Sequence, residues 1–154
     1  MPSLVLDIRT VTFGDFEQWL SLWDAYNKFY GRIDDKALAF EITKTTWERF
    51  LDPKEPVHAL VAESEGQLVG LAHYLFHRNT SMIGYSCYLQ DLYAQESLRG
   101  QGIGRALIRA VYEEAKKAGS TRVYWQTHET NLTAMKLYDK MGERSGFVVY
   151  RKDI

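Results

Sequence analysis

Three glycines occupy alternate positions, Gly100, Gly102 and Gly104. They follow an apolar stretch that ends at Ala94, and the last two begin an amphipathic stretch over residues 102–118. Because glycine has no Cβ, such a loop can turn tightly and let its backbone approach a ligand. The first amides of a following helix lack intrahelical acceptors and, with the helix dipole, favour an anion. The loop therefore predicts a strand–loop–helix unit that binds a pyrophosphate.

Two familiar phosphate-binding motifs do not fit this loop. A P-loop requires a Lys-Ser/Thr pair after its last glycine, and none follows Gly104. The dinucleotide fingerprint has the spacing G-x-G-x-x-G near the first strand of its unit, whereas this chain has G-x-G-x-G late in the sequence. Taken alone, the glycines could also be an ordinary turn and helix start.

The remaining chain divides into segments with strand or helix patterns. Strands are expected at 4–9, 57–64, 67–77, 85–94, 122–127 and 147–151, with a hairpin turn at Glu65-Gly66. Helices are expected at 15–30, 34–51, 102–118 and 131–141, the second with Asp34 as its N-cap. The order β-α-α-β-β-β-α-β-α-β predicts one domain over residues 1–154, of the α/β (α+β) class.

Composition narrows the possible functions. The formal net charge is -1 and no basic stripe is visible, so a nucleic-acid partner is not expected. No stretch approaches the ~20 apolar residues that a membrane helix needs, and the N-terminus does not read as a signal peptide, which favours the cytoplasm. Cys87 is the one cysteine, and the four histidines have no convincing ligand spacing, so we expect no metal site.

Two segments resemble a known family. The run Tyr88–Ala94 followed by 98–107 resembles the central motif of the GCN5-related N-acetyltransferases, whose signature Arg/Gln-x-x-Gly-x-Gly/Ala matches Arg99 to Gly104. Downstream, Trp125-Gln126-Thr127 followed by Asn131-x-x-Ala134-x-x-x-Tyr138 looks like the next motif of that family. The diamine (spermidine/spermine) acetyltransferases are the branch to which residues 88–141 are most similar.

The resemblance implies both a fold and a donor site. The fold would be a central, mixed but mostly antiparallel sheet flanked by helices, with a bulged fourth strand that splays from the fifth. The pantetheine arm of acetyl-CoA would enter this gap and pair with backbone groups of the strand. Residues expected to bind acetyl-CoA are Leu92, Tyr93, Ala94, Arg99, Gly100, Gln101, Gly102, Ile103, Gly104, Arg105, Asn131, Ala134 and Tyr138.

Two residues are expected to move protons. Tyr138 matches the tyrosine that the family places near the sulfur, where a phenol can protonate the departing thiolate; as an apolar-stripe residue it could also be a core aromatic. An alkyl ammonium, with a pKa near ~10.4, must lose a proton before it attacks. Diamine enzymes carry a Glu-Asp pair here, but this chain has Gln90 before Asp91. Three alternatives remain for the loss of this proton: Asp91 takes it, a water chain takes it, or the amine arrives already neutral.

The acceptor side is expected to lie under the first two helices, which the family uses to cover this site. Their aromatic residues and carboxylates suit a cationic amine, although core packing explains the tryptophans equally well. Tyr26, Gln90 and His128 are predicted to contact the acceptor. The relatives usually form homodimers, so a homodimer is expected by analogy.

These features predict an N-acetyltransferase that moves the acetyl group of acetyl-CoA to a primary amine of a small molecule, such as a polyamine or amino acid. Direct transfer is expected because Cys87 has no evident histidine partner for an acyl-cysteine route. Acetylation of a protein lysine or peptide N-terminus, and CoA binding without turnover, are the alternative functions.

Overall fold

The computed structural model describes residues 4–154, so the first three residues of the predicted domain lie outside the described range. Five strands form one sheet in the order β1-β2-β3-β4-β5. All neighbouring pairs are antiparallel except β4 and β5, which are parallel. The strands are β1 (Asp7–Thr10), β2 (Val57–Ser64), β3 (Gln67–His77), β4 (Ser86–Ala94) and β5 (Arg122–Tyr124).

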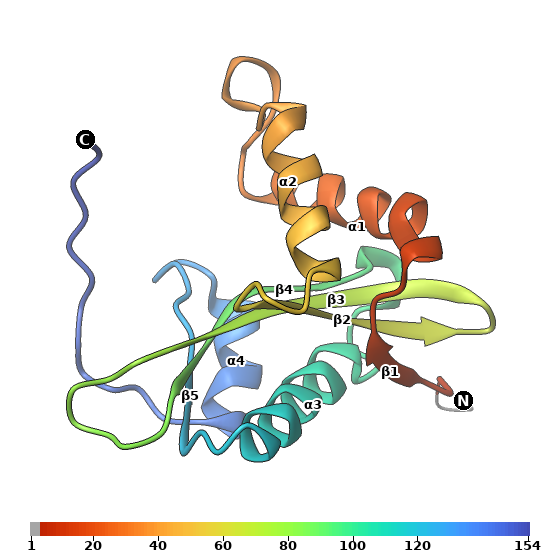
Figure 1. Cartoon of the computed structure of the whole chain (residues 1–154). Coiled ribbons are helices and arrows are strands. Elements are labelled where there is room, and N and C mark those ends of the chain that lie inside the picture. Colours follow the sequence, from red (N-terminus) through yellow and green to blue (C-terminus); the bar gives the residue numbers. More distant parts are fainter. Residues whose placement is uncertain (1–3) are drawn as a thin grey trace.

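Helices cover both faces of this sheet (Figure 1). On one face lie α1 (Phe16–Phe29) and α2 (Phe40–Leu51), and on the other lie α3 (Ile103–Lys117) and α4 (Leu132–Met141). Each face has its own apolar core, centred on Trp19 and Leu71 under α1 and α2, and on Leu107 and Val111 under α3. This arrangement confirms the mixed, mostly antiparallel sheet flanked by helices.

The β4 strand departs from regular pairing at two points. A register shift places His73 opposite Asp91 and Tyr74 opposite Leu89, so Gln90 is an extra, bulged residue. On the other side, β4 pairs with β5 only from Ser86 to Tyr88, and its remaining residues have no partner there. The strands therefore part after Tyr88, as the resemblance implied, and β5 ends three residues earlier than the predicted 127.

The predicted helix over 34–51 is wrong in its first part. A 3-10 turn, Asp34–Lys36, precedes α2, which begins at Phe40 with Ala39 as its N-cap. Asp34 has a φ of 54° and cannot be the N-cap, which normally has extended backbone geometry. Leu38 instead packs against the aromatic core, so the connection is held in an extended form by tertiary contact.

The predicted strand over 147–151 is also wrong. These residues have no secondary structure, and the chain end stands apart from the sheet in Figure 1. Phe147 and Tyr150 are 90% and 94% exposed. Their apolar pattern suits a strand, but a strand also needs a neighbouring edge with which to pair, and none lies beside this segment. The first strand is correct in place but is shifted, running from Asp7 to Thr10.

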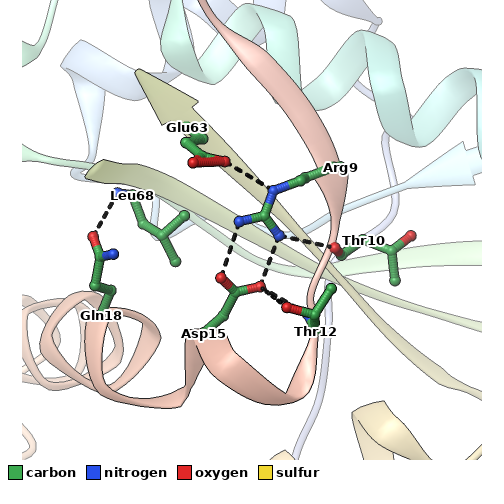
Figure 2. A network of polar contacts seen from close by, with 7 residues as sticks. All are labelled: Arg9, Thr10, Thr12, Asp15, Gln18, Glu63 and Leu68. Carbon is green, nitrogen blue, oxygen red and sulfur yellow. Dashed lines mark hydrogen bonds and ion pairs between the residues drawn. The ribbon is translucent and has the colours of Figure 1, made fainter. Parts of the chain in front are cut away.

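A polar network attaches α1 to the sheet (Figure 2). The Arg9 guanidinium lies between the carboxylates of Asp15, at 2.7 and 2.9 Å, and Glu63, at 2.9 Å. Nearby, Gln18 accepts a hydrogen bond from the Leu68 amide. The Arg9 contact lowers the pKa of Asp15 to about 2. These contacts fix the start of α1 over β1, β2 and β3, and thereby position the residues that α1 contributes to the site.

Candidate active site

A small cavity lies where β4 and β5 part. Its lining comes from three elements, α1, β4 and α4, and from the segments after α1 and β5: Tyr26, Tyr30, Leu89, Gln90, Leu92, Trp125, Gln126 and Tyr138. Because β4 has no partner strand on its β5 side beyond Tyr88, this edge of the strand is available to an extended ligand. The gap therefore fits the pantetheine arm that the resemblance placed against Leu92, Tyr93 and Ala94.

Tyr138 reaches this cavity from α4. Its ring packs edge-on against Trp125, with centroids 5.6 Å apart. Burial, with a smaller contribution from Tyr30, raises the pKa of Tyr138 to about 12. The phenol therefore stays protonated at physiological pH and can donate a proton. Tyr138 also touches the α3-side core, so the packing role and the proposed chemical role are compatible.

The glycine loop leads directly into α3. Gly100 and Gly102 have φ values of 82° and 86°, in the left-handed region that non-glycine residues rarely adopt. Gly102 is the N-cap of α3, and no side chain caps this end of the helix. The amides of its first turn are therefore left for an external anion, which is the arrangement expected for a pyrophosphate site.

The other predicted donor residues surround this loop in different ways. Arg99 is exposed and lies over the rings of Phe29 and Tyr93, at 5.4 and 5.5 Å from the centroids, while Arg105 is half-buried in the first turn of α3. The Ile103 side chain is buried in the core, so this residue can offer only its backbone. Asn131 is the N-cap of α4, and Ala134 follows in its first turn.

Asp91 is held by donors on both of its carboxylate oxygens. Tyr26 donates its hydroxyl proton to Oδ1 at 2.7 Å, and the Nδ1 of His73 lies 2.9 Å from Oδ2. The indole of Trp19 lies 3.0 Å from the Nε2 of His73. Because an indole N–H can only donate, Nε2 must accept and Nδ1 must carry the proton toward Asp91. The chain Trp19–His73–Asp91–Tyr26 thus keeps the carboxylate oriented.

A larger cavity of about 340 Å³ lies on the α1/α2 side of the sheet. Asp91 and His73 form part of its floor, and α2 and the segments around it supply its walls. Gln90 lines both this cavity and the smaller one, so the bulge is the junction between them. Among residues 4–154, Asp91 is the one carboxylate that lines either cavity.

The predicted site residues are not all brought together. Tyr26, Gln90, Asp91 and Tyr138 line one or both of the two adjoining cavities. His128 is exposed, bonded to Thr130 through Nδ1 at 2.7 Å, and lines neither cavity. Cys87 is fully buried, and burial raises the pKa of its thiol to about 12, which disfavours a nucleophilic thiolate.

Sequence reasoning missed His73, which contacts the predicted acid–base residue directly. The signal that could have found it is a histidine inside the apolar run of β3, directly opposite Asp91 in the register of the two strands. The missing information was that register, because the bulge at Gln90 sets it. Within residues 4–154, no three His, Cys, Asp or Glu side chains are grouped to hold a metal ion.

Comparisons with known proteins agree with this geometry. The model of the Acetyltransferase (GNAT) family matches residues 19–142. The D-amino-acid N-acetyltransferase HPA3 of Saccharomyces cerevisiae is 34% identical, over 95% of this chain and 89% of the relative. The thialysine N-epsilon-acetyltransferase of Mus musculus is 32% identical over 61% of this chain and 62% of its own length.

A solved aminoglycoside N-acetyltransferase, AAC(6')-Iy in complex with CoA, has the same fold. It aligns with a TM-score of 0.77 and 22% identity, over 99% of this chain and 98% of that chain. No helix within residues 4–154 is long and apolar enough to cross a membrane.

The chain belongs to the GNAT family of acetyltransferases. It is therefore an N-acetyltransferase, and acetyl-CoA is its co-substrate.

Proposed function

We propose that this enzyme transfers the acetyl group of acetyl-CoA directly to a primary amine of a small molecule. The observation that carries this proposal is the junction at Gln90, which lines both the gap that suits the pantetheine arm and a separate cavity of about 340 Å³ that Asp91 also lines. A donor site and an acceptor site therefore meet beside the phenol of Tyr138.

On the donor side, the amides of Gly100, Gln101, Gly102, Ile103, Gly104 and Arg105 are proposed to hold the pyrophosphate. Arg99 adds charge at the rim, where it is exposed. Leu92, Tyr93 and Ala94 would pair with the pantetheine through their backbone, because no strand occupies that edge of β4. Asn131 and Ala134, at the start of α4, would contact the same arm of the ligand.

Tyr138 and Asp91 are proposed to complete the proton transfers. Tyr138, protonated below its pKa of about 12, gives its proton to the departing thiolate. Asp91 faces the acceptor cavity and attracts the ammonium group, then accepts its proton directly or through water. Gln90 cannot act as a base, since an amide does not take up a proton in this range. Its position at the junction suits it to position the amine.

The acceptor is proposed to be small because its cavity, of about 340 Å³, is bounded by α1, α2 and the sheet. Similar proteins support this class: the yeast relative is named for D-amino acids and the mouse relative for thialysine. Tyr26 would contact the acceptor from α1, and burial together with Asp91 raises its pKa, which keeps its hydroxyl as a donor. His128 would contact the acceptor only if the loop after β5 moved toward the junction.

We further propose that residues 1–154 form one domain that works as a homodimer in the cytoplasm, where a single free cysteine suits the reducing conditions. The apolar side chains from Phe147 to Tyr150 are 65–94% exposed, and β5 is a sheet edge. A second copy could cover both. Light scattering should then give twice 17.9 kDa; a monomer at micromolar concentration would refute the dimer.

The proposed reaction is tested by incubating the protein and acetyl-CoA with amines, amino acids, aminoglycosides and a lysine peptide, and measuring thiol release. We expect release to depend on a small amine, with the product heavier by one acetyl group in mass spectrometry. Release with the peptide alone would favour a protein acceptor. Tight CoA binding without any acetylated product would favour a non-catalytic protein.

A further inference from the structure

The acceptor cavity contains charges of both signs. Asp91 contributes the negative charge from β4, and its side chain is only 12% exposed. Arg32, after α1, and Arg49, near the end of α2, are the two arginines among its lining residues. The remaining lining is mostly apolar, including Trp23, Leu38, Ile42, Phe50, Val57 and Leu75. Neither arginine forms an ion pair with a carboxylate anywhere in residues 4–154.

Arg32 is held in a defined place rather than extended into solvent. One of its nitrogens donates to the Asn27 side chain at 2.8 Å. Its guanidinium carbon lies 5.9 and 5.5 Å from the ring centroids of Tyr26 and Tyr30. These contacts use one N–H group of five and leave the others available to an acceptor oxygen.

Arg49 approaches the cavity from α2. It lies seven residues after Ile42 and three after Thr46, so the three residues share one face of the helix, and all three line the cavity. Its side chain is largely exposed, whereas that of Asp91 is 12% exposed, so an entering molecule would meet Arg49 before Asp91. The cavity therefore offers guanidinium donors at its walls and a carboxylate near the junction with the donor site.

We propose, on the basis of the function above, that the acceptor is an amino acid whose carboxylate binds Arg32 and Arg49 while its amino group faces Asp91. A guanidinium recognises a carboxylate through parallel N–H···O bonds. Removing one partner leaves the other desolvated without a hydrogen bond, which weakens binding. A polyamine carries only positive charges, and its second ammonium would meet the two arginines. The pair thus selects amino acids over the corresponding decarboxylated amines.

The test compares matched acceptors in matched variants. Phenylalanine (each enantiomer) is paired with phenethylamine, and lysine with cadaverine, so each pair differs only by the carboxylate. Arg49→Gln and the double variant Arg32→Gln/Arg49→Gln are compared with Lys44→Gln, which removes the same charge from an exposed position on the same helix. Steady-state kinetics give kcat/KM, and calorimetry gives amino-acid affinity in the presence of CoA.

We expect wild-type enzyme to prefer the amino acid of at least one pair. Arg49→Gln should lower kcat/KM for that amino acid roughly 10- to 100-fold, mostly through KM, and weaken its binding in calorimetry. The decarboxylated partner should be used as well as before or better, and Lys44→Gln should match wild type. An unchanged amino-acid preference in the double variant would overturn the carboxylate site.

The two proposals fail in different ways. If no amine in either set is acetylated, the proposed function fails, whereas acetylation of cadaverine and phenethylamine in clear preference to the amino acids refutes the carboxylate site and retains the acetyltransferase. If Arg49→Gln lowers kcat/KM equally for the amino acid and its decarboxylated partner, the residue only maintains the cavity, which also contradicts the proposal.

Discussion

The two faces of the sheet build their halves of the site in different ways. On the α3 face, the proposed donor site consists mainly of backbone from residues 92–105, in which Gly100 and Gly102 hold positive φ values ahead of the helix. On the α1/α2 face, the proposed acceptor site consists of side chains from separate elements, with Tyr26 and Asp91 65 residues apart and His73 and Asp91 18 apart. Donor binding therefore depends on local conformation, and acceptor choice depends on tertiary structure.

The largest effect is expected from changing the donor backbone. Gly102→Asp should weaken CoA binding by about 100-fold or more, because it places a carboxylate at the helix N-terminus where the pyrophosphate is proposed to bind. Asparagine tolerates the φ of this position and adds no charge, so Gly102→Asn should weaken CoA binding by less than about 10-fold. Calorimetry measures both; equal affinities for Gly102→Asp and wild type would contradict the loop assignment.

Tyr138→Phe tests the point where the two faces meet. Without the phenol, the thiolate must leave unprotonated, so kcat should fall by about 100-fold while CoA affinity stays unchanged. Because the pKa of Tyr138 is about 12, the wild-type enzyme should lose no activity through its ionisation at any pH well below that value. Wild-type turnover by Tyr138→Phe across the pH range would show that the residue only packs in the core.

Asp91→Asn tests the acceptor face. It removes the charge and leaves an amide against two donors, Tyr26 and His73, so kcat/KM for the amine should fall roughly 10- to 100-fold. CoA affinity should not change, because the donor site lies on the other side of the junction. Asp139→Asn, an equivalent change at an exposed position of α4, serves as the control. Unchanged amine kinetics at every pH would exclude Asp91 from proton transfer.

The smallest catalytic effect is expected from the network that attaches α1. Asp15 has its pKa lowered from 3.8 to about 2, so its stabilising contact with Arg9 is fully present above pH 3.8 and is lost as the pH falls toward 2. Asp15→Asn should reduce the free energy of unfolding by about 2 kcal/mol near neutral pH, with kcat/KM nearly unchanged.

Urea unfolding measures this change, with Glu17→Gln on the exposed face of α1 as the control. The difference between Asp15→Asn and wild type should shrink when the measurement is repeated below pH 3. A constant difference from pH 7 to pH 2 would assign the effect to packing rather than to the ion pair.

The same contrast explains what the sequence could predict. The hairpin at Glu65-Gly66 and the helix after Gly102 are local patterns, and the structure confirms them, whereas the phosphate-binding role of the loop before that helix stays a prediction. A bulge in the fourth strand followed from the family resemblance, but its position at Gln90 and the contact of His73 with Asp91 required the strand register. The prediction of a strand at 147–151 was wrong for the same reason. The residues of this segment favour a strand, but a strand forms only where a neighbouring strand can pair with it.

The most direct test of the account is a crystal structure with CoA and an acceptor amine analogue. We expect the pantetheine beside Leu92, Tyr93 and Ala94, the thiol within hydrogen-bonding distance of Tyr138, and the amine in the cavity that contains Asp91. The two ligands should approach each other beside Gln90. A thiol directed away from Tyr138, or an amine bound outside that cavity, would contradict the claim that the two faces of the sheet join their sites at the bulge.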